Sequence, residues 1–238
     1  MKRFYKETAA AAGEGGFRVL LDGKPMRTPA KSILTVPTLP LAEAIATEWG
    51  GVPDNGEVNA AHLPLTRLAA TGLDRVATRR EDVIADTAKY AGSDLLCYRA
   101  STPDSLVKAQ HDRWQPLLDW AAERHGARFV VAEGITFVDQ PEEARQRLKD
   151  EVATYSDAAL SALYNLTHMS GSVVIALAVA EGRLTAEEAF LAAQVEELYQ
   201  IERWGDDPHA QKQREGVRKD LESCARFLAL LGDSKKRG

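Results

Sequence analysis

Acidic side chains gather between Val195 and Asp207, in a segment that also carries two large aromatic residues. Carboxylates in such a group can bind a metal ion, act as a general acid–base pair, attract a basic partner, or face solvent on an ordinary helix. The residues that could carry one of these roles are Glu196, Glu197, Tyr199, Glu202, Trp204, Asp206 and Asp207.

A helix is predicted to carry most of this segment. Thr185 and Glu188 have the spacing of a capping box, which predicts the start of a helix at Thr185. Gly205 suits the position just beyond a helix C-terminus, so the same helix is expected to continue to Trp204.

The helical phase separates the acids of the segment. At about 100° per residue, Gln194 falls in the middle of an apolar stripe, and Glu187 falls near it. Glu197 and Glu202 fall at the two edges of the stripe, whereas Glu196 points the opposite way and is expected to be solvated. The apolar stripe consists of Phe190, Leu191, Leu198 and Ile201.

Glu202 is in an unfavourable electrostatic position in this prediction. A carboxylate near a helix C-terminus is destabilised by a few tenths of a kcal/mol up to about 1 kcal/mol, and Asp206 and Asp207 add like charge. Two explanations stay open: a basic group of a partner, or an internal salt bridge to one basic side chain. Trp204 is interpreted as a core or boundary anchor. The internal candidates are Arg67, Arg75 and Arg113.

The histidines and glycines do not form a known catalytic or cofactor motif in the sequence. No histidine follows a glutamate at the third position, and zinc, dinucleotide and phosphate-binding motifs are missing. The glycines near Gly13 are interpreted as a turn. One enzymatic hypothesis remains, in which Glu187, Glu202 and His168 meet between two helices as an acid-based site.

Composition indicates an ordinary globular protein. The 238 residues carry a net charge of −5, which disfavours binding to nucleic acid. Cys97 and Cys224 form no paired motif, which indicates a reducing compartment, and no signal peptide is recognised. A stretch without charged residues runs from 158 to 180, and its polar residues favour one buried central helix over a membrane span.

The elements that position these residues change type along the chain. The first third is β-rich, with a hairpin at Asp22-Gly23 and a helix that begins after Thr38. A helical pattern follows residue 64, so we predict an α+β fold with a mixed domain at 1–64 and a helical domain at 65–238. Arg27 and Trp49 are predicted to be structural residues of the first domain.

Several strings, taken in order, resemble the ATP synthase assembly chaperone family usually called Atp-twelve. They are RFYK, LDGKPMRTP, LAEAIATEW, PLTRLAATGLDRV, YAGSDLLCYRA, WQPLLDW and the long run from Ser170 to Asp207. The resemblance implies a small mixed domain followed by a helical one. It also implies a chaperone acting in the cytoplasm, which holds the free alpha subunit of the F-type catalytic head until the beta subunit replaces it. We expect the protein to be a monomer without a cofactor.

The same resemblance implies that an acidic position in the C-terminal helical motif matters for function. Glu202 is the first choice for that position and Glu197 the second. The candidate partner-binding residues are Glu202, Glu197, Trp204, Asp206 and Gln194.

Overall fold

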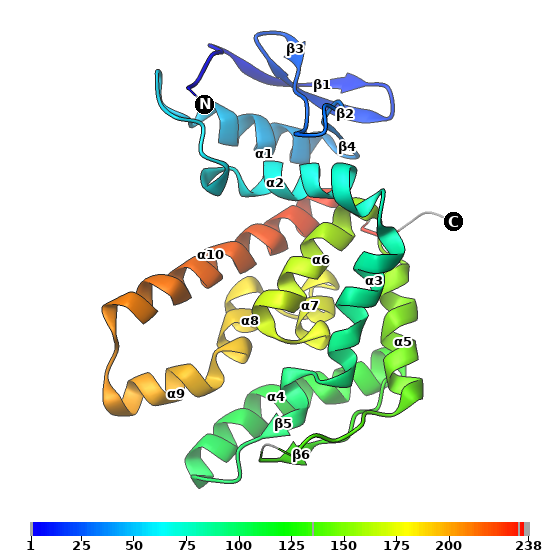
Figure 1. Cartoon of the computed structure of the whole chain (residues 1–238), viewed down its shortest axis with the longest axis vertical. Coiled ribbons are helices and arrows are strands. Elements are labelled where there is room, and N and C mark those ends of the chain that lie inside the picture. Colours follow the sequence, from blue (N-terminus) through cyan, green and yellow to red (C-terminus); the bar gives the residue numbers. More distant parts are fainter. Residues whose placement is uncertain (1, 135, 233, 236–238) are drawn as a thin grey trace. The chain divides into compact units, whose positions relative to one another are not determined.

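The computed structural model of the protein describes residues 2–134, 136–232 and 234–235. A small sheet lies in the N-terminal part, and most of the remaining chain is helical (Figure 1). The predicted α+β fold class is therefore confirmed. The strands are β1 (Thr8–Gly13), β2 (Gly16–Leu21), β3 (Lys24–Pro25), β4 (Thr35–Val36), β5 (Tyr98–Arg99) and β6 (Ala132–Glu133).

Ten α-helices, three short 3₁₀-helices and one short π-helix make up the helical part of the described chain. The short segments are Ala60–His62, Gly72–Val76, Lys89–Gly92 and Leu95–Cys97. The α-helices are α1 (Leu39–Gly50), α2 (Pro64–Thr71), α3 (Arg80–Ala88), α4 (Asp104–His125), α5 (Glu142–Ala153), α6 (Asp157–Ser170), α7 (Val173–Ala180), α8 (Ala186–Ala193), α9 (Val195–Trp204) and α10 (Pro208–Leu231).

The described residues fall into two compact units. The first unit combines the ranges 1–80, 156–162 and 226–238, and the second combines 81–155 and 163–225. The domain boundary after residue 64 remains a prediction.

The sheet of the first unit is built from tight turns. β2 pairs with β1, β3 and β4 in antiparallel register. The predicted hairpin at Asp22-Gly23 is confirmed, because both residues have positive φ (48° and 76°), as a type I′ turn requires. The glycine-rich segment at Gly13 is the β1–β2 turn, with Gly13 paired to Gly16, as predicted. Arg27 is exposed and donates from Nη1 to the carbonyl of Lys31 at 2.7 Å.

Helix α1 begins where the sequence predicts and packs against β1 and β2. Thr38 is its N-cap, and Leu41 and Ile45 are fully buried. Trp49 is 8 % exposed, and its Nε1 donates to the Thr66 hydroxyl at 3.0 Å. The Tyr5 hydroxyl donates to the Trp49 carbonyl at 2.8 Å, so this side chain and its backbone are both held within the first unit.

The prediction of one long central helix over 158–180 is wrong. Gly171 has a φ of +71° and ends α6, and the Ser172 side chain then accepts from Ile175 N to cap α7. Every residue of α7 from Val173 to Val179 is buried. None of the described helices combines the length and apolar character that a span across a bilayer requires. In α4, Pro116 is accommodated inside a continuous helix of 22 residues.

Candidate functional site

The predicted helix from Thr185 to Trp204 is in fact two helices, α8 and α9, which meet at Gln194. Gln194 has φ −110° and ψ 18°, outside the helical region, and it is half-buried. The indole of Trp114 on α4 donates to the Ala192 carbonyl at 2.8 Å, which takes up a helical acceptor next to the break. The capping box at Thr185 and the end at Gly205 are as predicted.

This break invalidates the apolar stripe inferred for a continuous helix. Gln194 is a junction residue and lies in no helical face. Glu196, expected to be solvated, accepts a hydrogen bond from the Gln110 amide of α4 at 2.6 Å. It therefore helps to hold α9 on α4 and does not serve as a free acid.

Two further acids of the segment share one arginine on α10. Arg214 Nη1 donates to Glu197 Oε1 at 2.7 Å, and its Nη2 lies 2.5 Å from Asp206 Oδ2. Arg214 is 8 % exposed. The hydrogen bonds that Arg214 donates to Glu197 and then to Asp206 raise the pKa of Arg214 above its ordinary value, which keeps the cation charged. Both acids therefore have an internal counter-ion.

Asp207 has a structural role at the start of α10. Its Oδ2 accepts from the backbone N–H of Ala210 at 2.8 Å, so it caps the helix that Pro208 opens. The positive end of the α10 dipole also favours this carboxylate. The like-charge repulsion expected between Glu202, Asp206 and Asp207 is thus offset by local partners of the two aspartates.

Glu202 differs from the other acids. It is exposed, and its side chain forms neither a hydrogen bond nor an ion pair with any residue that the structure describes. The internal salt bridge considered for Glu202 is accordingly not made by any described residue. Its neighbour Arg203 turns away from it, with Nη2 2.9 Å from the Ser105 hydroxyl and the guanidinium 4.4 Å from the centre of the Tyr199 ring.

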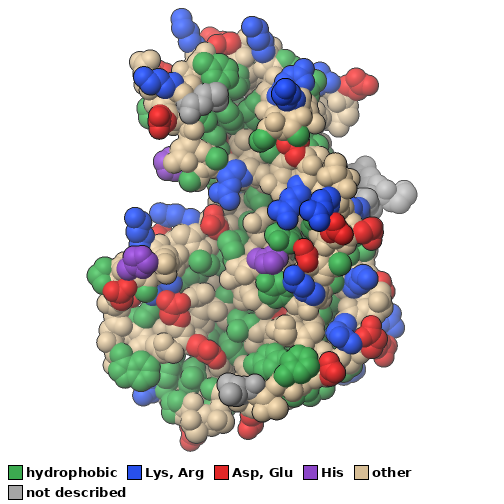
Figure 2. All heavy atoms as spheres, viewed as in Figure 1, with side chains coloured by type: hydrophobic (Ala, Val, Ile, Leu, Met, Phe, Trp, Pro, Cys, Tyr) green, Lys and Arg blue, Asp and Glu red, His purple; other side chains and the backbone are tan. Residues whose placement is uncertain are grey.

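Trp204 is 76 % exposed, more than any other large hydrophobic side chain in the described part of the chain. The interpretation of Trp204 as a core or boundary anchor is therefore wrong. Figure 2 shows hydrophobic and acidic side chains next to each other at the surface where α9 lies in Figure 1. An exposed indole and an unpaired carboxylate, two residues apart at one helix end, form a surface suited to a protein partner.

The hypothetical acid-based site is not assembled. Glu187 pairs with Arg218 of α10 at 2.5 Å, and the Tyr90 hydroxyl lies 2.9 Å from His168 Nδ1. Burial lowers the pKa of His168, and the positive charge of Lys89 lowers it further. Among the described residues, one histidine and two glutamates do come close enough to hold a metal ion, but at a different place. They are His125, Glu151 and Glu181.

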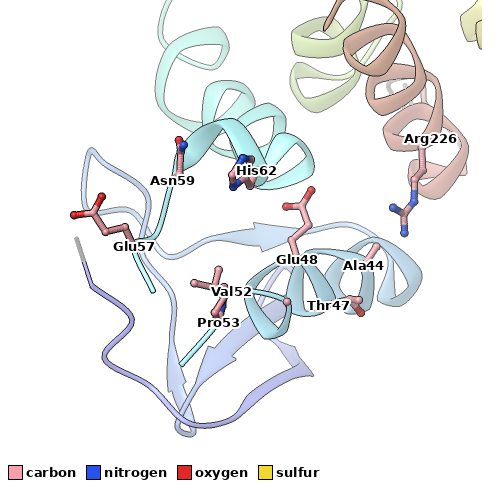
Figure 3. A pocket seen from close by; sticks show the side chains of 10 residues that line it. Ala44, Thr47, Glu48, Val52, Pro53, Glu57, Asn59, His62 and Arg226 are labelled. Carbon is pink, nitrogen blue, oxygen red and sulfur yellow. The ribbon is translucent and has the colours of Figure 1, made fainter. Parts of the chain in front are cut away.

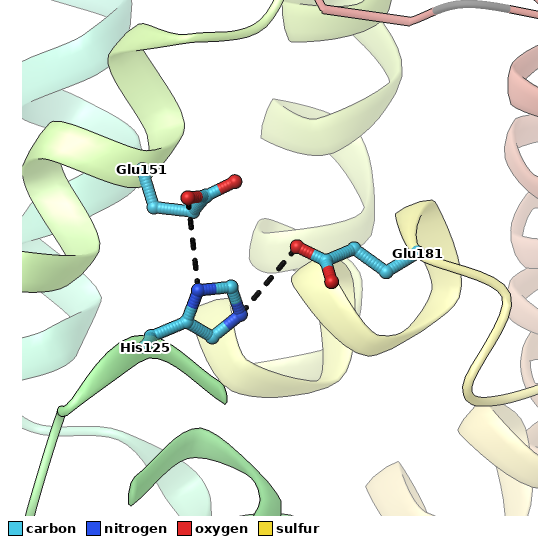
Figure 4. A group of neighbouring side chains, drawn as sticks. All are labelled: His125, Glu151 and Glu181. Atoms are coloured by element: carbon cyan, nitrogen blue, oxygen red, sulfur yellow. Dashed lines mark ion pairs between the residues drawn. The ribbon is translucent and has the colours of Figure 1, made fainter. Parts of the chain in front are cut away.

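That group joins the end of α4 to α5 and to the residue after α7 (Figure 4). His125 Nδ1 lies 3.6 Å from Glu151, and Nε2 lies 3.5 Å from Glu181. A single ion would use one ring nitrogen, whereas here each nitrogen faces a different carboxylate. Arg124 also donates to Glu181, at 2.8 Å. The geometry suits a network of ion pairs between helices better than a metal centre.

A pocket of about 290 Å³ lies within the first unit, and Glu48, His62 and Arg226 are among the residues that line it (Figure 3). Burial raises the pKa of Glu48, although hydrogen bonds to its carboxylate oppose this. Both Glu48 oxygens are engaged at the start of α2, where they accept from Leu65 N at 2.7 Å and from Thr66 N at 3.0 Å. The carboxylate thus caps a helix and is not poised for reaction.

The comparison with known families places the chain in one of them. A family model described as "ATP12 chaperone protein" matches residues 2–122. The chain belongs to the ATP12 chaperone family. The predicted family, an assembly chaperone of ATP synthase, is therefore confirmed at this level.

Relatives of this ATP12-family chain match nearly all of it. Protein atp12, mitochondrial, from Schizosaccharomyces pombe is 26% identical over 245 residues, covering 98% of this chain and 84% of the relative. The crystal structure of Atp12 from Paracoccus denitrificans has 38% identity and a TM-score of 0.91, covering 97% of this chain and 98% of that one. A variant of the Paracoccus protein with one aspartate replaced by lysine matches with the same TM-score of 0.91 and 38% identity, covering 97% of both chains.

In this ATP12-family structure, the five predicted partner-binding residues have different surroundings. Glu202 and Trp204 are exposed at the end of α9, Glu197 and Asp206 meet on Arg214, and Gln194 forms the α8–α9 junction. Sequence reasoning missed Arg214, for which no local signal exists. It also missed the capping role of Asp207, although an aspartate directly before a proline is a typical helix start.

Proposed function

We propose that this chain is an assembly chaperone that binds the free alpha subunit of the F-type ATP synthase catalytic head. It would hold that subunit soluble until the beta subunit takes its place. The observation that carries the proposal is the exposure of Trp204, 76 %, beside the carboxylate of Glu202. Tryptophan is among the residues that most often dominate binding energy at protein interfaces.

The chemistry of the α9 end defines the partner surface that it fits. The negative end of the helix dipole makes Glu202 unfavourable in the free protein, by a few tenths of a kcal/mol up to about 1 kcal/mol. A lysine or arginine of the partner would relieve this, and an apolar pocket beside that cation would bury the indole of Trp204. We therefore expect the alpha subunit to present a basic side chain next to an apolar depression.

We further propose that the chain acts as a cytoplasmic monomer without a cofactor and catalyses no reaction. The absence of a reaction is supported by the acids of the α9–α10 region, since Glu196, Glu197, Asp206 and Asp207 each have a structural partner. For the same reason, we propose that only some of the five candidate partner-binding residues contact the partner directly. Glu202 and Trp204 are proposed to contact the alpha subunit, whereas Glu197, Asp206 and Gln194 are proposed to support that surface.

Co-expression with the alpha subunit alone tests the proposal. The wild-type chain should co-purify with the alpha subunit and keep it soluble, and Trp204→Ala should weaken capture by about 30-fold, corresponding to the 2 kcal/mol or more typical of an interface hot spot. Trp204→Ala should melt at the wild-type temperature, because the side chain is exposed. Equal capture by the two proteins would refute the docking site, and absence of capture by the wild type would refute the function.

A further inference from the structure

We infer that Arg214 is the positioning residue that holds the end of α9 in the orientation presented to the partner. This inference rests on the proposed function for its consequence in binding. The conformational role of Arg214, in contrast, is argued from the structure alone.

Arg214 connects three parts of the second unit through one guanidinium. The arginine lies on α10, Glu197 lies on α9, and Asp206 lies in the connection between the two helices. The distances are 2.7 Å from Nη1 to Glu197 and 2.5 Å from Nη2 to Asp206. Arginine suits this task because its planar fork directs several N–H donors at fixed angles, so that two carboxylates can be held at once.

The two acids bracket the proposed docking residues along the chain. Glu202 and Trp204 come after Glu197 and before Asp206. A clamp on both bracketing residues therefore restrains the segment from each side. Trp204 itself is 76 % exposed, so its orientation depends on the backbone to which it is attached.

The connection needs such a restraint because it contains a flexible residue. Gly205 has φ 86° and ψ 171°, a conformation that is accessible almost only to glycine. Glycine permits the sharp change of direction between α9 and α10 but adds conformational freedom at the same point. Asp207 fixes the start of α10 by capping it, and Arg214 fixes Asp206 immediately before it.

The burial of Arg214 also favours a positioning role. Its exposed fraction is 8 %, whereas the acids it binds have half-exposed side chains, 43 % for Glu197 and 32 % for Asp206. Ion pairs on a buried charged residue are often no more stabilising than apolar residues of the same volume, while they can specify one arrangement among several. We assign that specifying role to Arg214 at the α9–α10 corner.

Amide hydrogen exchange tests the conformational part without any partner. Arg214→Met removes the guanidinium and keeps the apolar stem, and Arg218→Met is the matched control, since Arg218 also lies on α10 and pairs with Glu187 at 2.5 Å. Exchange over residues 202–211 should accelerate roughly tenfold in Arg214→Met and stay near wild type in the control. Arg214→Lys should fall between them, because it keeps the charge and loses the fork.

A double-mutant cycle on alpha-subunit capture tests the functional part. Arg214→Met should reduce capture per folded molecule, and it should reduce capture less in the Trp204→Ala background than in the wild type, because the clamp acts in part through Trp204. Additive losses would overturn the assignment, as would unchanged capture in Arg214→Met. Unchanged exchange at the corner would overturn the clamp itself. If the wild type captures no alpha subunit, the proposed function fails, and the exchange measurement still decides whether Arg214 is a clamp.

Discussion

Glu202 and Asp94 are two carboxylates with opposite surroundings. Glu202 is exposed and makes no ion pair with any residue that the structure describes. Asp94 is fully buried, and its oxygens accept hydrogen bonds from Leu96 N at 3.1 Å and from Val174 N at 3.3 Å, near the start of α7. The carboxylate of Glu202 is therefore accessible to a partner, whereas that of Asp94 accepts hydrogen bonds from buried backbone groups.

Replacing Glu202 separates binding from stability. Glu202→Gln should leave the melting temperature unchanged or slightly higher, because no described residue depends on its charge and the helix dipole disfavours it. It should weaken alpha-subunit capture, by about 2–5 kcal/mol if the carboxylate forms a buried interfacial pair. Glu123→Gln is a suitable control, since Glu123 is exposed on α4 and has no ion pair within the described chain. A lower melting temperature with intact capture would make Glu202 a structural residue.

Asp94 should make the protein less stable as the pH rises through the acidic range. Burial is the main cause that raises its pKa from 3.8 to about 6, against hydrogen bonds that lower it. The folded protein therefore binds this proton more tightly than the unfolded chain does. The resulting stabilisation is complete below about pH 4 and is lost as the pH passes about 6, an effect on the order of 3 kcal/mol.

The measurement is the free energy of unfolding of the wild type and of Asp94→Asn between pH 4 and pH 7. The asparagine does not titrate, so the wild-type value should fall relative to the variant as the pH increases. Other carboxylates titrate equally in both proteins and cancel in the difference. Parallel pH profiles would show that Asp94 is ionised in the folded state throughout this range.

At the scale of elements, the sequence predicts helix starts better than helix interruptions. The starts at Thr38 and Thr185 are encoded locally, because each side chain accepts a backbone N–H of its own first turn. The break at Gln194 has no such signal, since glutamine is a good helix former and the bond that accompanies the break comes from Trp114 on another helix. Gly171 could have predicted the end of α6, because glycine is typical just beyond a helix C-terminus. The uncharged residues on both sides of it instead favoured one continuous helix.

Trp49 is one of the buried residues through which helix α1 contacts the rest of the first unit. Trp49→Arg would place a charge in a site that is 8 % exposed, and we expect a loss of roughly 3–5 kcal/mol or more in unfolding free energy. Trp49→Phe is the control, because it keeps an aromatic ring and loses the hydrogen bond to Thr66. Denaturant unfolding checks both, and a wild-type midpoint for Trp49→Arg would show that this position tolerates charge.

At the scale of the whole molecule, the fold class and family could be predicted because many short strings occur in one order along the chain. The α9–α10 site could be predicted only in outline. Arg214 is 17 residues from Glu197, so neither helical periodicity nor spacing reveals their pairing. The exposure of Trp204 was missed for a related reason, since exposure depends on how α9 packs and not on residue type.

The whole molecule should neither bind nor hydrolyse ATP. The sequence contains no phosphate-cradling glycine loop, and its glycine-rich segment at Gly13 forms the turn between β1 and β2. Calorimetric titration with ATP and magnesium should show no saturable heat at micromolar protein. Saturable binding in the micromolar range would contradict this expectation, and hydrolysis above the buffer blank would contradict the assignment as a non-enzyme.

The first unit is completed by residues from the other end of the chain. The Thr38 hydroxyl, which caps α1, also donates to the carbonyl of Leu230 at 2.5 Å, and Ser156 N donates to the carbonyl of Ser234 at 2.9 Å. During synthesis on the ribosome, the sheet and α1 emerge before Leu230, which follows Thr38 by 192 residues. The sheet and α1 must therefore wait for a much later segment of the chain before the first unit can be completed.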